Sequence, residues 1–175
     1  MEEFVILVDE KDSETGIMEK IQAHLEAHLH RAFSVFIFNK TGELMLQQRA
    51  FTKYHTPGLW TNTCCSHPRP GEKTADAAHR RLKEEMGFDC NFEEAFSFTY
   101  KAAFDNQLTE HEFDHVFIGT SEELPVINPE EVASWRFATM QQISLEMQQH
   151  PENFTIWFRI AFDQVAKFFN DRIKD

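Results

Sequence analysis

The segment from residue 60 to residue 87, WTNTCCSHPRPGEKTADAAHRRLKEEMG, limits the fold of this chain more than any other segment. Residues 61–65 predict a strand, and the Pro- and Gly-containing residues 66–71 predict a loop. Residues 74–87 predict an amphipathic helix that ends at Gly87, the residue type that best adopts the left-handed conformation after a helix. The segment is therefore expected to form a strand, a loop and a helix in succession.

Glu85 is expected on the buried face of this helix, because it follows Leu82 by three residues and Arg81 by four. A carboxylate directed inward needs an arginine or a metal ion as its partner. The helix alone leaves both interpretations open, a Glu85–Arg81 ion pair and a ligand for a divalent metal. The preceding loop favours the metal, since it brings three further polar side chains to the same end of the helix: Cys65, His67 and Glu72.

The length of 175 residues allows one domain with a full hydrophobic core, to which 18 phenylalanines contribute much of the volume. No apolar run is long enough to span a bilayer, and the acidic N-terminus lacks the basic region of a secretory signal. Cys64, Cys65 and Cys90 form neither a paired framework nor a CxxC motif, which indicates free thiols. A cytoplasmic protein is expected.

The formal net charge of −12 argues against general nucleic-acid binding, which needs a positive surface. The same charge repels a small anionic substrate at long range. Such a substrate would need a local cluster of Lys and Arg, a bound cation, or both.

Periodicity and turn signals predict a mixture of strands and helices elsewhere in the chain. The predicted strands cover residues 4–8, 33–38, 44–48, 92–100, 113–118 and 132–137. The predicted helices cover residues 18–28, 140–149 and 153–173, and residues 39–42 (NKTG) predict a hairpin turn.

Two further groups of residues could bind a metal ion. His24 and His28 are one helical turn apart, a spacing that can chelate a metal, although a single histidine in such a place is more often a surface residue. Glu110 and Glu112 lie on one face of a predicted strand, where two like charges are costly unless a cation binds between them or one is protonated. A solvated strand edge is the alternative for this acidic pair.

The two adjacent cysteines are expected to point to opposite faces of their strand, so only one of them can face a site. A disulfide between neighbouring residues would be strained, which indicates two thiols. His67 would share the face of Cys65 if the strand continued that far.

The loop and helix resemble a degraded Nudix box, a signature of enzymes that process diphosphates. The matching positions are Glu72, Arg80, Leu82, Glu84, Glu85 and Gly87. Two positions depart from it: Ser66 replaces the opening glycine, and Arg81 replaces a glutamate that Nudix hydrolases use.

Four motifs are similar to those of the type I isopentenyl-diphosphate delta-isomerase family, and the resemblance covers almost the whole chain: WTNTCCSHP, EK…H…LHRAFS, RAFTKYHTPGLWTN and Glu110-His-Glu112. That resemblance implies an α/β (α+β) Nudix-like fold, a mixed β-sheet flanked by helices, as a single domain over residues 1–175.

The resemblance also implies a role for particular residues. The implied catalytic residues are Cys65, Glu112, Tyr100 and Trp157. The implied ligands of Mg²⁺, Mn²⁺ or Zn²⁺ are His24, His30, His67, Glu110 and Glu112. Glu85 is implied to assist a Mg²⁺ that bridges the diphosphate. The implied substrate-binding residues are Lys20, Arg49, Lys53, Ser66 and Arg81. Cys65 and Glu112 would transfer protons, Tyr100 would assist Glu112, and the ring of Trp157 could stabilise a carbocation.

The implied reaction is the interconversion of isopentenyl and dimethylallyl diphosphate by a monomer or weak homo-oligomer. A Nudix hydrolase that uses metal-activated water is the alternative, but Arg81 removes an acidic group from that machinery. A diphosphate- or metal-binding module without catalysis is a third interpretation, which would not need a thiol at residue 65. The sequence leaves open which group protonates, which metal binds, and what His28, His111 and His115 do.

Overall fold

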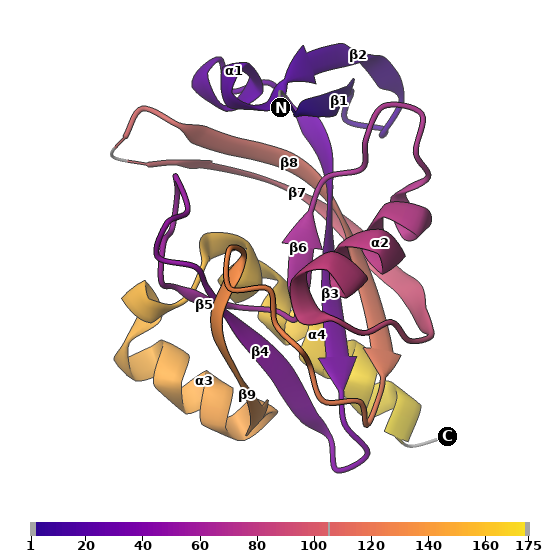
Figure 1. The fold of residues 1–175 in the computed structure, drawn as a ribbon, viewed down its shortest axis with the longest axis vertical. Helices are drawn as coiled ribbons and strands as arrows, with labels where there is room; N and C mark the ends of the chain where they lie inside the picture. Colours follow the sequence, from indigo (N-terminus) through magenta and orange to yellow (C-terminus); the bar gives the residue numbers. More distant parts are fainter. Residues whose placement is uncertain (1–2, 105, 174–175) are drawn as a thin grey trace.

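The computed structural model describes residues 3–104 and 106–173 of the chain (Figure 1). The strands are β1 (Phe4–Val8), β2 (Glu14–Glu19), β3 (His30–Phe38), β4 (Glu43–Arg49), β5 (Trp60–Thr61), β6 (Cys64–Ser66), β7 (Phe92–Ala103), β8 (Thr109–Thr120) and β9 (Val132–Thr139). The helices are α1 (Lys20–Leu25), α2 (Thr74–Met86), α3 (Met140–Gln149) and α4 (Ile156–Ile173), with a short 3₁₀ helix, η1 (Pro151–Asn153), before α4.

Strand β3 is the centre of one mixed sheet. It pairs antiparallel with β1, β4 and β6 and parallel with β8, while β8 also pairs antiparallel with the long strand β7. On the other side, β4 pairs antiparallel with β5 and β9. The predicted mixed sheet flanked by helices is therefore confirmed.

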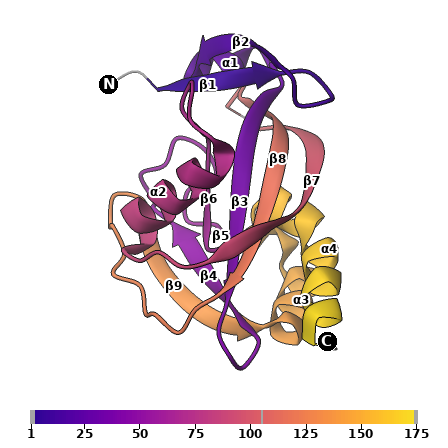
Figure 2. The same ribbon diagram turned by 90° about the vertical axis from the view of Figure 1, so that its right-hand side faces the viewer.

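The side chains of β3 alternate between two hydrophobic clusters, because successive residues of a strand point to opposite faces. Val35 and Ile37 pack in the cluster beneath α2, which includes Leu82. Phe36 and Phe38 pack in the cluster beneath α3 and α4. Figure 2 shows α2 on one side of the sheet and α3 with α4 on the other. The strand buries both faces, which explains why its sequence, FSVFIF, is apolar except for Ser34.

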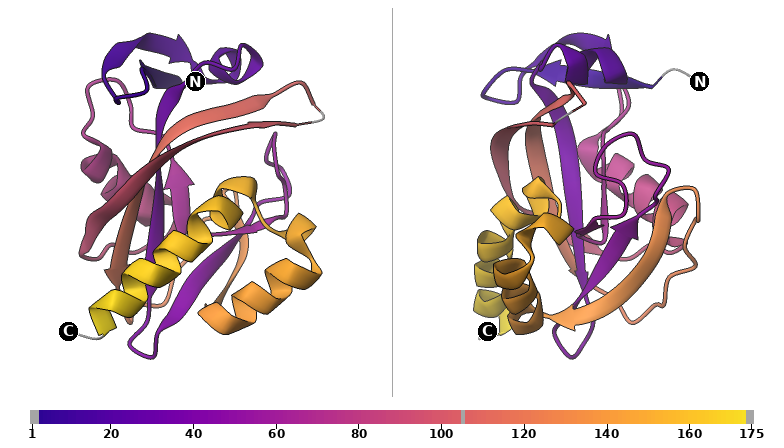
Figure 3. Two further views of the ribbon diagram at one scale, coloured as in Figure 1. Left: turned by 180° about the vertical axis from the view of Figure 1, so that it is seen from behind. Right: turned by 90° about the vertical axis from the view of Figure 1, so that its left-hand side faces the viewer.

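The N-terminal elements form a layer over one end of the sheet. Strands β1 and β2 pair with each other, β1 also pairs with the start of β3, and α1 contacts β8. The β7–β8 hairpin runs beneath this layer in both views of Figure 3. Residues of α1, β3, β6 and β8 are thereby gathered at one end of the molecule.

The helix predicted over residues 18–28 is wrong in its bounds. Residues 14–19 form strand β2, which pairs with β1, and the helix covers only Lys20–Leu25. The Glu19 side chain accepts hydrogen bonds from the backbone N–H groups of Ile21 and Gln22, so it caps the helix. Ala27 has a positive φ of 57°, so the chain cannot continue in the right-handed helical conformation there. Pairing with β1 outweighs the local helical preference of Met18 and Glu19.

The strand predicted over residues 61–65 is interrupted after Thr61. Thr63 Oγ1 donates to the Met45 carbonyl and accepts from the Ile37 N–H, so its side chain replaces a backbone ladder bond. Strand β6 begins at Cys64 and pairs with β3. This break turns the chain from the β4 side of the sheet to the β3 side.

Within residues 3–104 and 106–173, no helix combines the length and apolar character that crossing a membrane requires.

Gly87 ends α2 with φ +76°, where a Cβ atom would overlap the carbonyl oxygen of Val126. We expect Gly87→Ala to lower the free energy of unfolding by about 2 kcal/mol, because a strained left-handed residue costs about 1–3 kcal/mol. Urea denaturation would measure the change. In the control Gly16→Ala, the added Cβ meets no atom within 4 Å, and we expect a change below about 0.5 kcal/mol. Equal stabilities of the two variants would contradict this explanation.

Candidate active site

A cavity opens beneath the N-terminal layer and continues into an outer cavity of ≈ 800 Å³. The inner part is lined mainly by polar and charged side chains, among them Lys20, Ser34, Gln47, Arg49, Lys53, His55, Cys65, Ser66, His67, Arg81, Glu85, Glu110, Glu112, Glu131 and Trp157. Most of the residues that the sequence analysis singled out therefore face one space, while His24 and His30 are not among its lining residues. Tyr100 reaches it indirectly, through a hydrogen bond to Glu112.

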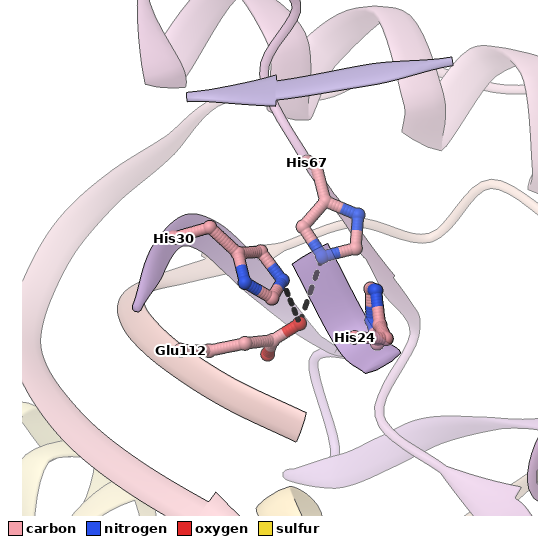
Figure 4. A group of neighbouring side chains, drawn as sticks. All are labelled: His24, His30, His67 and Glu112. Atoms are coloured by element: carbon pink, nitrogen blue, oxygen red, sulfur yellow. Dashed lines mark hydrogen bonds and ion pairs between the residues drawn. The ribbon is translucent and has the colours of Figure 1, made fainter. Parts of the chain in front are cut away.

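Three histidines and a glutamate form a compact group beside this cavity (Figure 4). One potential ligand atom from each of the four residues lies within 4.8 Å of the other three. His67 Nε2 lies 2.8 Å from Glu112 Oε1, and His30 Nε2 lies 3.6 Å from the same oxygen. The rings of His24 and His30 have their centroids 4.8 Å apart.

Four different elements bring this group together. His24 belongs to α1, His30 begins β3, His67 follows β6, and Glu112 lies on β8. The parallel pairing of β3 with β8 places His30 opposite Glu112. No local sequence spacing could show this proximity, because the two residues are far apart along the chain.

The backbone orients two of the histidine rings. His24 Nδ1 lies 2.6 Å from the Lys20 carbonyl oxygen, and His30 Nδ1 lies 2.9 Å from the His28 carbonyl oxygen. A carbonyl oxygen only accepts, so each Nδ1–H donates and each neutral ring keeps its lone pair on Nε2. Both Nε2 atoms therefore present the form of imidazole that binds a metal.

His24 also belongs to a second possible ligand group, with His55 and Glu110. Three buried atoms of the two groups have no hydrogen-bond partner within the described residues: His24 Nε2, His30 Nε2 and Glu110 Oε2. Unpaired buried polar atoms are costly, and a cation bound by them would remove that cost. A set of imidazole and carboxylate ligands suits Zn²⁺, Mn²⁺ or Mg²⁺. The residues present therefore fit a divalent metal ion.

Strand β8 presents a row of buried carboxyl groups, Glu110, Glu112 and Asp114, on one face. Burial raises the pKa of Glu110 to about 7 and that of Asp114 well above its ordinary value. Burial alone would also raise the pKa of Glu112, but the neighbouring His30 and His67 rings hold it well below its usual range. These acids repel one another where water cannot screen them, which favours a cation among them.

Asp114 was missed by the sequence analysis. It is 1% exposed, and its Oδ2 accepts a hydrogen bond of 2.8 Å from the Ser34 hydroxyl. Its signal was available, because Asp114 continues the two-residue spacing of Glu110 and Glu112 along the strand.

The two adjacent cysteines point to opposite faces of the sheet, as predicted. Cys64 is fully buried in the cluster beneath α2, while Cys65 lines the cavity and packs against the other cluster. All three cysteines, including Cys90, are free thiols. Burial raises the pKa of Cys65 to about 12, so the side chain keeps its proton at neutral pH.

Tyr100 lies opposite Glu112 in the β7–β8 pairing and donates a hydrogen bond of 2.7 Å to Glu112 Oε2. Burial raises the pKa of Tyr100 well above its ordinary value, which keeps the phenol protonated. The predicted association of Tyr100 with Glu112 is therefore present as a direct contact.

The cationic residues expected to bind substrate line the cavity together. Arg49 lies over the Trp157 ring, with Cζ 5.4 Å from the ring centroid, and its guanidinium donates to the His55 carbonyl. Lys53 is paired with Glu131, and Arg81 Nη2 lies 3.3 Å from the other oxygen of the same carboxylate. Lys20 and Ser66 line both the inner and the outer cavity. Glu131, which bridges two of these cations, was missed by the sequence analysis.

Glu85 is buried, as the helical spacing predicted, and both of its oxygens have donors. Arg81 Nη2 lies 2.7 Å from Oε1, and Gln47 Nε2 donates to Oε2 at 2.9 Å. The Glu85–Arg81 ion pair is therefore formed. Glu85 faces the same cavity as the histidine group but is not part of that group among the described residues. Its role as a ligand of Mg²⁺ stays a prediction.

The three histidines whose roles the sequence leaves open, His28, His111 and His115, are not among the lining residues of the cavity, and each has its own partner. His28 follows the end of α1 and pairs with Glu26, so it does not form a chelating pair with His24. The other two contacts are His111 Nδ1 with the Ala27 carbonyl, and His115 with Glu94 and Asp12.

Comparison with known proteins identifies the class of the protein. The NUDIX domain family matches residues 28–158. Two solved structures share the fold: a MutT protein from Methanosarcina mazei (TM-score 0.66, 19% identity, covering 84% of this chain and 96% of that one) and a C. elegans Ap4A hydrolase (TM-score 0.57, 17% identity, covering 81% and 98%). The chain belongs to the Nudix family.

Closer relatives narrow this assignment. The isopentenyl-diphosphate Delta-isomerase of Pectobacterium atrosepticum is 51% identical over 164 residues, covering 94% of this chain and 92% of the relative. That of Serratia proteamaculans is 52% identical over 158 residues, covering 90% and 88%. Within the Nudix fold, the chain therefore belongs to the isopentenyl-diphosphate Delta-isomerase family.

Glu72 lines neither cavity but holds the loop before α2. Its carboxylate accepts from Arg80 Nε at 2.7 Å and from the Arg69 N–H at 2.9 Å. The hydrogen bond from Arg80 lowers the pKa of Glu72. The stabilisation of the folded state by the Glu72–Arg80 pair is therefore complete above about pH 4.5. It is lost as the pH falls through the lowered pKa of Glu72.

We expect Glu72→Gln to lower the free energy of unfolding at pH 7 by on the order of 1 kcal/mol. The difference from wild type should vanish at acid pH, where Glu72 is protonated in both states. Urea denaturation at pH values between 7 and 3 would measure it. The control is Glu10→Gln, at an exposed residue after β1, for which no difference is expected. A difference that persists at acid pH would show that charge is not its cause.

Proposed function

We propose that the chain interconverts isopentenyl diphosphate and dimethylallyl diphosphate, with Cys65 and Glu112 as the proton-transfer groups and a divalent metal at the histidine and glutamate residues. The observation that carries this proposal is a protonated thiol and a hydrogen-bonded carboxylate that line one cavity beside a metal-ligand set. Relatives about half identical over nine-tenths of the chain carry the name of this isomerase.

Moving the double bond requires that one carbon gains a proton and another loses one. Alkenes are poor bases, so this step needs an acid at close range in a site from which water is excluded. The half-buried thiol of Cys65 carries a proton at neutral pH, and the Glu112 carboxylate is held ionised by its histidine neighbours. The two groups would exchange roles between the two directions of the reaction.

Tyr100 and Trp157 would support these proton transfers. The Tyr100 hydroxyl is bonded to Glu112 Oε2, so it fixes the carboxylate and stabilises its charge. The Trp157 side chain lines the cavity and is 4% exposed. Its ring face would stabilise the tertiary carbocation that forms when the alkene is protonated.

Lys20, Arg49, Lys53, Ser66 and Arg81 would hold the diphosphate. The four cations line one cavity of a chain whose formal net charge is −12, which provides the local positive cluster that an anionic substrate needs. Lys53 and Arg81 share an ion pair with Glu131 in this structure, and Lys20 pairs with Glu3. A diphosphate carries more negative charge than one carboxylate and would compete with Glu131 for them.

His24, His30, His67, Glu110 and Glu112 would hold the divalent metal, for which Mg²⁺, Mn²⁺ and Zn²⁺ are the candidates. Burial lowers the pKa of His67 to about 3, so the ring is neutral, as a metal ligand must be. A bound cation would supply the positive charge that the two buried carboxylates lack. Glu85 would assist a Mg²⁺ that bridges the diphosphate.

Hydrolysis of a diphosphate is the alternative from another reaction class. Arg81 stands where Nudix hydrolases use a glutamate, and its guanidinium lies 2.7 Å from Glu85. One carboxylate of that machinery is therefore absent. The similarity to the MutT protein concerns the fold alone. Isomerisation is favoured for these reasons.

We further propose that residues 1–175 act as one domain, because both hydrophobic clusters pack against the same sheet. Three free thiols support a cytoplasmic location. A monomer or weak homo-oligomer remains the proposal for the assembly state.

Incubation with isopentenyl diphosphate and Mg²⁺ in D₂O tests the reaction. We expect deuterated dimethylallyl diphosphate without release of phosphate, because the added proton exchanges with solvent. The activity should disappear when the protein is stripped of metal with a chelator and return when Mg²⁺, Mn²⁺ or Zn²⁺ is added. Mass spectrometry would follow the product, and a phosphate assay would run in parallel. Phosphate release without deuterated product would indicate a hydrolase instead.

Replacing either proton-transfer group should abolish isomerisation without unfolding the protein. We expect Cys65→Ala and Glu112→Gln each to lower kcat by at least about 10²–10⁴-fold, the usual contribution of a positioned acid or base. The matched controls are Cys90→Ala, a thiol away from the cavity, and Glu94→Gln, a partner of His115. A Cys65 or Glu112 variant with near-normal turnover would remove that residue from the mechanism.

A further inference from the structure

His55 lies in the loop between β4 and β5 and has no role in the proposed reaction. Its side chain is 8% exposed, and its Nε2 lies 3.1 Å from Glu110 Oε1. This distance is that of an N–H···O hydrogen bond. Carboxylates that bind metals are commonly held by an outer hydrogen-bond partner, and His55 is placed to be one for Glu110.

The surrounding residues hold the His55 ring in one orientation. Nδ1 lies 3.1 Å from the Thr56 hydroxyl, and the ring packs edge-on against Tyr54, with centroids 4.5 Å apart. The ring also stacks nearly parallel to Phe104, at 5.9 Å. Arg49 Nη2 donates to the His55 carbonyl oxygen at 3.3 Å, which anchors the backbone of the loop. The direction of Nε2 is therefore set without any metal.

The two oxygens of Glu110 have different surroundings. Oε1 faces His55, while Oε2 lies 3.3 Å from His24 Nε2 and has no hydrogen-bond partner within the described residues. Only Oε2 is therefore free to bind a cation together with His24.

We infer that His55 is a positioning residue of the metal site, which donates a hydrogen bond from Nε2–H to Glu110 Oε1 and thereby directs Oε2 towards the metal. The inference rests on the proposed function, since it concerns the metal site of that proposal. The Thr56 hydroxyl can donate to Nδ1, which places the ring proton on Nε2, where the carboxylate accepts it. His55 thus acts through Glu110 and does not touch the metal.

The position of His55 separates this role from direct ligation. His24, His30, His67 and Glu112 place their ligand atoms within 4.8 Å of one another, and His55 is not part of that group among the described residues. His55 forms a second possible ligand group with His24 and Glu110. An Nε2–H directed at Glu110 Oε1 has no lone pair left on that nitrogen for a metal, so the two roles exclude each other. An outer hydrogen bond of this kind typically changes metal affinity 10–100-fold.

The test measures the affinity of the metal-free full-length chain for Mn²⁺ and Zn²⁺ by competition with a chelating dye. His55→Leu removes the N–H donor. His55→Asn keeps an N–H donor, but on a shorter side chain that cannot reach Glu110. His55→Gln keeps an N–H near the place of Nε2. His150→Gln is the matched control, because His150 is on the surface, with its side chain 63% exposed. Thermal unfolding of each metal-free variant would verify the fold.

We expect His55→Leu and His55→Asn to weaken binding about 10–100-fold, with His55→Gln restoring most of the affinity. His150→Gln should bind as wild type does. X-ray absorption of the Zn²⁺-loaded proteins should give the same number of coordinated histidine nitrogens in wild type and in His55→Asn.

Three results would overturn the inference. Unchanged affinity in both His55→Leu and His55→Asn would show that the hydrogen bond does not position Glu110. Loss of one coordinated nitrogen in His55→Asn would make His55 a ligand. Wild-type protein that binds neither Mn²⁺ nor Zn²⁺ would overturn the proposed metal site itself, which distinguishes that failure from a failure at His55 alone.

Discussion

The parallel pairing of β3 with β8 is the constraint on which the site depends. Its register places His30 opposite Glu112, and the alternation of β8 directs Glu110 and Asp114 to the same face. Three carboxyl groups are thereby buried side by side, where water cannot solvate them. The neighbouring elements supply hydrogen-bond donors or metal-ligand atoms for this row: His24, His55, His67, Ser34 and Tyr100.

The charges of the cavity are balanced within the chain. Glu131 pairs with Lys53 and Arg81, and Glu85 pairs with Arg81 and Gln47. An acidic chain thus keeps a cluster of cations inside one cavity, with Lys53 and Arg81 in ion pairs and Arg49 over the Trp157 ring. The same arrangement suits an anionic substrate, because a diphosphate can take the place of a weaker internal partner. Binding and stability therefore use the same side chains.

Most of the elements could be predicted because their signals are local. The β3–β4 hairpin follows from the turn at residues 39–42, and α3 has the predicted bounds. The opposite directions of Cys64 and Cys65 follow from strand alternation alone. The helix near residue 20 was misjudged because an edge pairing with β1 outweighed its local preference. His55 and Glu131 carried no local signal, since each acquires its partner only through the fold.

The sequence by itself determined the family, the candidate residues and the faces of most strands, because these properties depend on residue type and on spacing within one element. Only the tertiary structure decided which of the candidates meet. His24, His30, His67 and Glu112 come from four elements, and their proximity depends on the pairing of β3 with β6 and β8. The structure also decided that Glu85 has two protein donors. Long-range pairing sets such distances, and no sequence spacing encodes them.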